Sequence, residues 1–588
     1  MAEESKLNFS IFKRLVTYAK PYKKFFFIAL ACVIIIAISS VIRPLLIANM
    51  VQQYIIEKQD GGALLFWTLT IFGMLAFEAL LQFSSSYFSN FLAQSIVSDM
   101  REKLFAHMTS FRMKYFDKTP IGALVTRVVS DMEAISEVFS TGLIDILGDF
   151  LTLLAVILTM FYVNWHLTML VLIPIPLLII ATRIFARSMN NSFLQERLQV
   201  TRLNTFVQER ITGMSIVQLF NRENEEFENF KEINKAHRKA HINAIWAFSI
   251  FFPVVEILSS LSVAFLLVYI AFQVEGLNGL DMKTQYLEVI KFTFWISMLF
   301  RPIRQLADKF NILQRGTVRA ERVFEILDLD EHIQKEGTLS NCDFNQTIKF
   351  ENVFFAYQNE DWILKNINLT IKPNSTVAFV GATGAGKSSI VNLLGRFYEF
   401  QKGDIFIGDI NIKKLELTYL RNNIAIVLQD VFLFSDSIHN NITLGNESIS
   451  REQVIIASKA IGAHTFIEKL PDGYDYHVGE RGGVLSVGQR QLLAFIRAYV
   501  YNPTILILDE ATSSVDNESE EMIQRATEQL TRGRTSIVIA HRISTIKKAD
   551  QIVVLDRGEI KEQGTHTELL LLDGFYKRLY DKQFTEQK

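Results

Sequence analysis

The segment GATGAGKSS, residues 381–389, has the residue types and spacing of a phosphate-binding loop, hereafter the P-loop. An apolar run, STVAFV, precedes it and a helical pattern, SIVNLLGRFY, continues from it, which is the setting that such a loop needs. Glycines let backbone N–H groups curl around a phosphate at a helix start, where the dipole favours negative charge. Lys387 adds a positive charge for the β- and γ-phosphates, and Ser388 offers a hydroxyl to Mg²⁺. The predicted ATP-binding residues are Gly381, Ala382, Thr383, Gly384, Ala385, Gly386, Lys387, Ser388 and Ser389.

Two acidic residues close the apolar run ILILDE, residues 505–510. The run predicts a strand that delivers Asp509 to its carboxyl end, beside the P-loop, where the carboxylate can hold Mg²⁺ through water. Glu510 is then placed to polarise an attacking water as a general base. Two solvated acids at a strand end are the simpler alternative, and the P-loop upstream favours the catalytic interpretation.

Two single residues occupy similar positions, because Gln429 closes the apolar run IAIVLQ and His541 closes SIVIAH. Alone, each would be interpreted as a capping or surface residue. In a sheet whose strand ends face a nucleotide, both side chains can reach the γ-phosphate. We therefore expect neutral His541 to hydrogen-bond the γ-phosphate and Gln429 to bind the metal.

The elements that must position these residues fall into two parts of the 588-residue chain. The composition is 49% hydrophobic with 47 phenylalanines, which is too apolar for an ordinary soluble enzyme. Long apolar runs lie before residue 310, whereas strand-like and helical runs alternate from residue 347. The predicted fold class is a six-helix α transmembrane domain followed by an α/β P-loop nucleotide-binding domain. The formal net charge of −2 gives no reason to expect a nucleic-acid partner, and two cysteines cannot build a disulfide framework.

Six apolar runs are long enough to cross a bilayer, which takes about 20 residues each. They lie near Phe25–Met50, Ala63–Phe83, Ile144–Val163, His166–Phe185, Ile245–Val274 and Tyr286–Leu306. The last run is the least clear, because Lys291 and the Arg301-Pro302 pair interrupt it. The first run is too long for the apolar core of a signal peptide, so we expect it to remain as a membrane anchor.

Basic residues gather in the second and fourth connections between these runs, which are also the longest ones. Positive charge marks the cytoplasmic side. We therefore predict a multi-pass protein of the inner (cytoplasmic) membrane, with both termini and the nucleotide-binding domain in the cytoplasm. Helical periodicity in the two connections predicts membrane helices that continue into the cytoplasm. The predicted parts are an interfacial amphipathic helix over 1–24, a transmembrane domain over 25–310, a linker over 311–346 and the nucleotide-binding domain over 347–588.

Taken in chain order, the motifs resemble those of the ATP-binding cassette proteins. They are Tyr357, the P-loop, Gln429, LSVGQ at 485–489, ILILDE, SSVD at 513–516 and His541. Six spans before one cassette resemble the bacterial half-transporter exporters of the multidrug and lipid-flopping kind, over essentially the whole chain. The resemblance implies that Tyr357 stacks on adenine, that Asp516 belongs to the nucleotide site, and that Gly479–Arg481 contact the cytoplasmic ends of the membrane helices.

The segment LSVGQ, hereafter the signature, implies a second chain. In this family the signature of one cassette closes over ATP that another cassette binds. Ser486, Gly488 and Gln489 would then present donors at a helix N-terminus to a γ-phosphate held by the Lys387 of another chain. One P-loop and one signature thus imply a dimer with two composite ATP sites.

Three departures from the family pattern leave the kind of dimer open. Val487 stands where the usual signature has glycine, SSVD replaces SALD, and HNNI at 439–442 lacks the acidic residue that many relatives have before the asparagine. A homodimer is slightly favoured, because the P-loop, Gln429, Glu510 and His541 are intact. A heterodimer with one impaired ATP site is the alternative.

The resemblance implies ATP-driven export of hydrophobic or amphipathic substrates, such as drugs or lipids, by alternating access. Ionisable residues inside spans are candidates for a role in cargo handling, and mutual pairing is the equal alternative. They are Arg43, Glu78, Asp145, Asp149 and Glu256. Segments 116–122 and 213–220 are the candidate contact helices between spans and cassette. An ATP-gated channel, a peptide exporter and an importer are the weaker alternatives.

Overall fold

A computed structural model describes residues 9–274, 279–333, 337–358, 360–509, 517–540 and 543–584. The chain forms two compact units, each treated separately below. The membrane unit comprises residues 1–109 and 121–330, and the cassette unit comprises residues 110–120 and 331–588.

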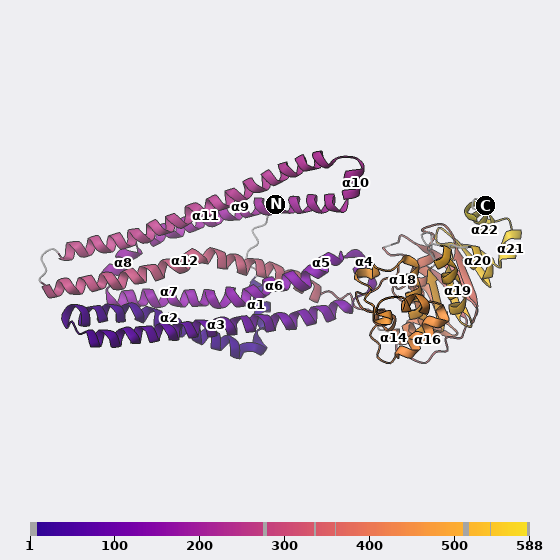
Figure 1. The fold of residues 1–588 in the computed structure, drawn as a ribbon, viewed down its shortest axis with the longest axis horizontal. Helices are drawn as coiled ribbons and strands as arrows, with labels where there is room; N and C mark the ends of the chain where they lie inside the picture. The colour runs from indigo at the N-terminus through magenta and orange to yellow at the C-terminus, as the bar shows by residue number, and fades with distance from the viewer. Residues whose placement is uncertain are drawn as a thin grey trace. The chain divides into compact units, whose positions relative to one another are not determined.

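All the regular secondary structure of the membrane unit is helical in its described residues (Figure 1). Its α-helices are α1 (Phe9–Thr17), α2 (Lys23–Met50), α3 (Gly61–Thr109), α5 (Ile121–Thr126), α6 (Met132–Glu137), α7 (Ile144–Val163), α8 (Trp165–Leu172), α9 (Ile175–Thr212), α10 (Met214–Leu219), α11 (Glu223–Val274) and α12 (Gly279–Leu327). Short 3-10 or π-helical segments are η1 (Lys20–Tyr22), η2 (Val51–Glu57), η3 (Arg127–Asp131) and η4 (Val138–Leu143).

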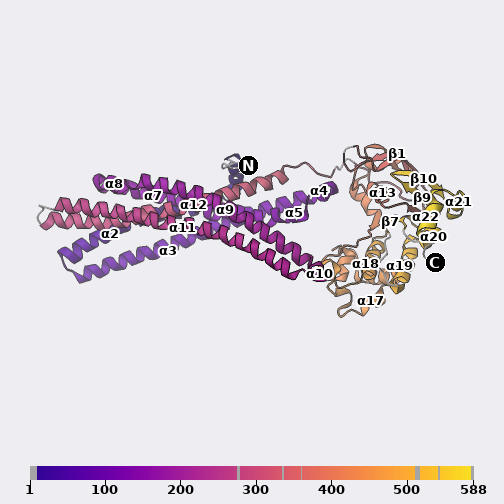
Figure 2. The same cartoon turned by 90° about the horizontal axis from the view of Figure 1, so that it is seen from above.

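Five helical segments of the described chain are long and apolar enough to cross a membrane. They are Lys20–Glu57, Gly61–Thr109, Ile121–Val163, Trp165–Thr212 and Glu223–Gln273. Helices α3, α9 and α11 are each much longer than the roughly 20 residues that a span requires, so their lengths fit the prediction that membrane helices continue into the cytoplasm. Helices α9 and α11 lie side by side and α10 joins them at one end (Figure 2).

Local sequence explains where the helices break. Asn164 has an extended backbone between α7 and α8, and its side chain accepts a hydrogen bond from the Leu167 N–H, so it caps α8. The fourth expected span is not one continuous helix, because α8 and α9 are separated at Ile173 and Pro174. Proline has no N–H to donate to the preceding turn, which accounts for the break.

The sixth expected span corresponds to α12, which packs into the bundle although it is not among the five apolar segments. Phe292, Trp295 and Phe300 are fully buried, and the Trp295 indole N–H lies 3.3 Å from the Val41 carbonyl oxygen of α2. The transmembrane domain followed by an α/β domain is therefore confirmed, whereas the number of six spans stays a prediction.

At least three of the five ionisable residues named in the expected spans form ion pairs. Arg43 of α2 lies 3.0 Å from the Glu78 carboxylate of α3, which also accepts a hydrogen bond from Ser39. Asp149 of α7 pairs with Lys309 of α12 at 2.5 Å. For these residues the structure supplies the partners that the pairing alternative required.

The cassette unit contains two sheets. Its strands are β1 (Ile348–Phe355), β2 (Leu364–Ile371), β3 (Thr376–Val380), β4 (Lys402–Ile407), β5 (Ile410–Asn411), β6 (Ile424–Val427), β7 (Ile505–Asp509), β8 (Thr535–Ile539), β9 (Gln551–Asp556) and β10 (Glu559–Gly564). The antiparallel sheet has the order β2-β1-β4-β5, and the larger sheet has the order β10-β9-β3-β8-β7-β6, parallel except for β10.

The helices of the cassette unit surround these sheets. They are α4 (Met113–Lys118), α13 (Lys387–Leu394), α14 (Leu417–Asn422), α15 (Ile438–Thr443), α16 (Arg451–Ile461), α17 (His464–Glu468), α18 (Val487–Val500), α19 (Asn517–Thr531), α20 (Ile543–Lys548), α21 (His566–Leu571) and α22 (Phe575–Phe584).

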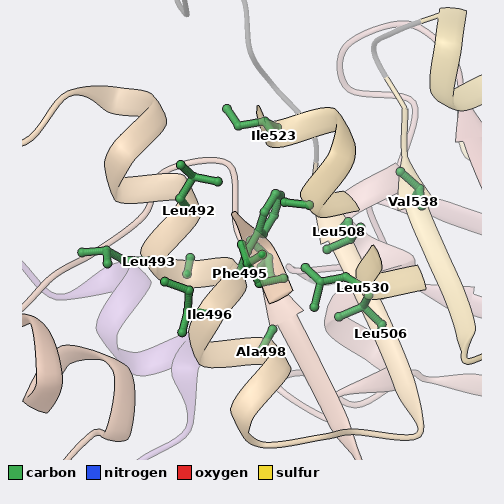
Figure 3. Packing of buried hydrophobic residues seen from close by; sticks show 14 of the residues in the cluster. Leu492, Leu493, Phe495, Ile496, Ala498, Leu506, Leu508, Ile523, Leu530 and Val538 are labelled. Atoms are coloured by element: carbon green, nitrogen blue, oxygen red, sulfur yellow. The ribbon is translucent and has the colours of Figure 1, made fainter. Parts of the chain in front are cut away.

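Two hydrophobic cores cover the two faces of the larger sheet. Successive residues of β7 alternate between them, with Leu506 and Leu508 in one core and Ile505 and Ile507 in the other. The first core packs α18 and α19 against β7 and β8 (Figure 3). The strands β7 and β8 are therefore buried on both faces, which leaves only their ends for site residues.

Candidate functional site

The carboxyl ends of three neighbouring parallel strands meet at one level of the larger sheet. Asp509, the last residue of β7, lies opposite Ile539 of β8, and Ile539 lies opposite Phe379 of β3. The P-loop begins one residue after the end of β3. The structure therefore brings Asp509 and the P-loop to the same sheet edge, where open α/β sheets bind their ligands.

Two P-loop glycines have backbones that a side chain would disrupt. Gly381 has φ +156°, and a Cβ there would lie 2.2 Å from the Leu555 carbonyl oxygen. Gly386 has φ +104°, caps the N-terminus of α13, and would place a Cβ 2.7 Å from Leu364. Glycine at these positions lets the loop curl tightly against β9 and β2 while the amino end of α13 stays open to a phosphate.

The Lys387 side chain folds back over the loop. Its ammonium lies 2.8 Å from the Gly381 carbonyl oxygen and 3.0 Å from that of Ala382. Burial lowers the pKa of Lys387, while the carboxylate of Asp509 acts in the opposite direction. In the described residues, two backbone carbonyl oxygens accept from this buried ammonium. Such a group is suited to a more negative partner, such as a phosphate.

Tyr357 lies beside the first turns of α13. Its hydroxyl is 3.2 Å from the Ser389 hydroxyl and 3.2 Å from the Asn392 amide nitrogen, and its ring meets Tyr398 edge to face. Asn392 was not predicted as a site residue. Its spacing of three residues from Ser389, on one face of the helix, is the signal that would have found it.

The residues predicted to hold a metal ion are an oxygen-rich set. Ser388 is exposed at the start of α13, and Gln429 is exposed two residues beyond Val427, the last residue of β6, which lies opposite Leu508 of β7. Gln429 therefore follows the same sheet edge as Asp509. Hydroxyl, amide and carboxylate oxygens are the ligands that Mg²⁺ takes together with substrate phosphates, so the donor set fits that ion.

Three predicted residues lie outside the described residues. They are Glu510, Asp516 and His541, which directly follow or come soon after the strands β7 and β8. Their predicted roles rest on the sequence.

The signature forms the N-terminus of α18. The Ser486 hydroxyl accepts from the Gln489 backbone N–H at 3.2 Å, and the Gln489 side chain accepts from the Ser486 N–H at 3.0 Å. This reciprocal capping leaves the other N–H groups of the first turn available to an anion. Gly488 is buried, whereas Val487 keeps 45% of its surface exposed.

The signature and the P-loop remain separate within the described part of one chain. No hydrogen bond or ion pair of Ser486, Gly488 or Gln489 reaches the P-loop. Within the described residues, the structure thus places Tyr357 against the P-loop and brings Asp509 and Gln429 to the sheet edge that the P-loop follows, whereas no hydrogen bond or ion pair joins the signature to them.

Comparison with known proteins agrees with this architecture. Residues 26–295 match the family described as the ABC transporter transmembrane region, and residues 364–513 match the family described as ABC transporter.

Relatives match over nearly the whole chain. The chain is 36% identical to a putative ABC transporter ATP-binding protein of Streptococcus pneumoniae, over 98% of each protein. It is 35% identical to an ATP-dependent lipid A-core flippase of Syntrophus aciditrophicus, over 100% of this chain and 96% of that one. It is also 35% identical to a probable multidrug resistance ABC transporter ATP-binding/permease protein of Bacillus subtilis, over 87% and 76% of the two chains. The chain therefore belongs to the ABC transporters, as a half-transporter exporter that fuses one membrane domain to one ATPase cassette coupled to transport.

Proposed function

We propose that two copies of this half-transporter clasp each ATP between the P-loop of one chain and the signature of the other. The observation that carries this proposal is the capped N-terminus of α18, which offers Ser486 and first-turn N–H groups but makes no contact with the P-loop among the described residues of its own chain. A helix start of this kind stabilises a γ-phosphate. Two ATP molecules bound in this way hold the two cassettes together, and their hydrolysis lets the cassettes separate.

Within each composite ATP site, the chain's own residues position the nucleotide and the water. Lys387 exchanges its two carbonyl partners for phosphate oxygens, and Tyr357 stacks on the adenine ring. Ser388, Asp509 and Gln429 would hold Mg²⁺, which would supply positive charge to neutralise the phosphates. Glu510 orients and polarises the attacking water, His541 hydrogen-bonds the γ-phosphate, and Asp516 contributes to the nucleotide site.

Release and closure of the cassettes would drive alternating access of a cavity between two membrane units. Helix α10 supports a docking role for the 213–220 segment, because Ile216, Leu219 and Phe220 are all exposed. Exposed apolar side chains at the tip of a long helical hairpin are costly in water unless they meet another surface. We expect α4 and α10 to transmit the cassette motion, with both termini in the cytoplasm.

The proposed substrates are hydrophobic or amphipathic molecules, such as lipids or drugs. The names of relatives support this class, since they include a lipid A-core flippase and a probable multidrug resistance transporter. An open pocket of about 490 Å³ on α3 also supports it, because the pocket alternates aromatic rings with small polar groups. Its lining residues are Phe83, Ser86, Tyr87, Asn90, Phe91 and Gln94.

The test is transport and ATP hydrolysis by the purified chain in lipid vesicles, with and without fluorescent lipids and candidate drugs. Robust hydrolysis and outward movement by this chain alone support the homodimer, whereas activity only after adding a second half-transporter establishes the heterodimer. A Glu510→Gln variant should bind ATP but neither hydrolyse it nor move substrate. Full-rate movement in that variant would contradict active export and favour an ATP-gated channel.

A further inference from the structure

The N-terminal helix α1 is attached to the membrane unit by one face only. Leu15 is fully buried, and the Arg14 guanidinium donates to both carboxylate oxygens of Asp328 at 2.6 and 2.7 Å. The same guanidinium lies 4.1 Å from the centre of the Phe324 ring, on which Tyr18 also stacks. These contacts, hereafter the α1 clasp, fasten α1 to the last turns of α12.

The same region carries four exposed lysines, hereafter the basic patch. They are Lys13 on α1, Lys20 in η1, and Lys23 and Lys24 at the start of α2. None of the four forms an ion pair with a described residue. Two nearby acids are already engaged, because Asp328 pairs with Arg14 and Asp99 accepts a hydrogen bond from Tyr22.

Apolar side chains adjoin the basic patch. Val16 beside Lys13 is 38% exposed, and Phe27 and Ile28, one turn into α2, are 61% and 42% exposed. The patch lies at the start of a segment apolar enough to cross the membrane. Lysines beside exposed apolar groups at the end of a span match a surface that is apolar inside and negatively charged at its boundary.

We propose that the basic patch binds the headgroups of anionic phospholipids, and that the α1 clasp transmits this binding to the end of α12. Asp328 directly follows α12, and the cassette unit begins three residues later. Headgroup binding would hold α1 in place. It would thereby restrict movement of the end of α12, from which the chain continues into the cassette unit. An exposed ion pair such as Arg14–Asp328 is weak. Headgroup binding at the basic patch can therefore shift the equilibrium between the formed and the broken α1 clasp. This inference goes beyond the proposed transport function.

The experiment measures lipid selectivity first, because that readout needs no ATP hydrolysis. The full chain is reconstituted with spin-labelled phosphatidylglycerol or spin-labelled phosphatidylcholine, and the motionally restricted fraction gives their relative affinities. The wild type should prefer phosphatidylglycerol. The variant with Lys13, Lys20, Lys23 and Lys24 all changed to Gln should lose this preference by about fivefold or more, since each lysine near an anionic surface contributes about that factor.

A matched variant removes the same charge elsewhere. Arg202 on α9 and Lys235, Arg238 and Lys239 on α11 are exposed, and changing all four to Gln should preserve the preference. Equal selectivity of the wild type for both lipids overturns the proposal. So does an equal loss in both quadruple variants, or an unchanged preference when the basic patch is neutralised.

The role of the α1 clasp is tested by the ratio of ATPase rates in vesicles with and without phosphatidylglycerol. We expect phosphatidylglycerol to raise the rate of the wild type at least about twofold, a small shift of a two-state equilibrium. Arg14→Asp should keep lipid selectivity but lose this stimulation, and Arg14→Asp combined with Asp328→Arg should restore it. Stimulation that survives in Arg14→Asp overturns the role of the clasp, and a double variant that stays unresponsive does the same.

Discussion

The buried carboxylate of Asp131 accepts hydrogen bonds from Arg319, which lies 188 residues further along the chain, and from Arg127, one helical turn before it. Asp131 is 0% exposed, and the two contacts measure 2.5 and 2.9 Å. Close by, Gly316 lets α12 approach, because a Cβ there would lie 2.0 Å from the Val138 side chain. The α5–α7 segment and α12 are therefore joined by one ion cluster around a buried carboxylate.

Asp131→Asn should destabilise the protein by about 3 kcal/mol or more, because it leaves two guanidinium groups without the buried charge that they share. The measurement is thermal unfolding of the purified protein in detergent. Glu133→Gln is the matched control, since Glu133 is 61% exposed and lies 3.3 Å from Arg101. That change should cost less than about 1 kcal/mol. Similar losses of stability in both variants would show that the Asp131 cluster stabilises the protein no more than an exposed ion pair does.

Variants of Tyr357 separate its ring from its hydroxyl. Tyr357→Phe removes only the contacts to Ser389 and Asn392, so the KM for ATP should stay near that of the wild type. Tyr357→Ala also removes the stacking surface and should raise the KM about fivefold to tenfold. Steady-state ATPase measurements decide between them. If Tyr357→Phe were as impaired as Tyr357→Ala, the hydroxyl network and not adenine stacking would be the function of this residue.

Ser486 has two roles that one pair of substitutions can separate. Ser486→Ala removes the helix cap and should cost about 1 kcal/mol of stability together with activity. Ser486→Asp keeps a good capping group but repels a γ-phosphate. Its thermal stability should match the wild type while its ATPase rate falls at least about a hundredfold. If the Ser486→Asp protein kept its ATPase activity, the signature would not contact the γ-phosphate.

The lowered pKa of Lys387 predicts a pH dependence of ATP binding. Burial favours the neutral amine in the free protein, whereas bound phosphates favour the ammonium. At alkaline pH, binding should therefore take up protons, and affinity should fall as pH rises. Calorimetry of the Glu510→Gln variant in buffers of different ionisation heat measures this uptake. Lys387→Arg should bind more weakly but lose the uptake, since the guanidinium stays charged. Uptake that persists in Lys387→Arg would assign it to another group.

Much of the site could be predicted because its residues follow local patterns. The P-loop directly follows β3, Asp509 is the last residue of β7, and Gln429 lies two residues beyond β6. Parallel strands present their carboxyl ends at one edge. The clusters at Asp131 and Arg14 could not be predicted, because their partners Arg319 and Asp328 are distant in sequence. No periodicity within one helix indicates which residue of another helix will face it.

The last expected span shows a different limit. Lys291 and the Arg301-Pro302 pair weaken the apolar signal of α12. The structure nevertheless buries Trp295 and Phe300 in the same helix, and it also buries Pro302. A hydropathy average over a stretch of sequence counts the residues on all sides of the helix. It therefore does not show that one side is apolar and packs against other helices.

The central claim, that each ATP is shared between two chains, is tested most directly by mixing two inactive variants. Lys387→Ala disables the P-loop and Ser486→Asp disables the signature, so homodimers of either should not hydrolyse ATP. A dimer that contains one chain of each, purified by two different affinity tags, has one composite site with both defects and one site with none. We predict that the mixed dimer regains ATPase activity, approaching half that of the wild type if its two sites act independently. A mixed dimer as inactive as its parents would contradict the shared site.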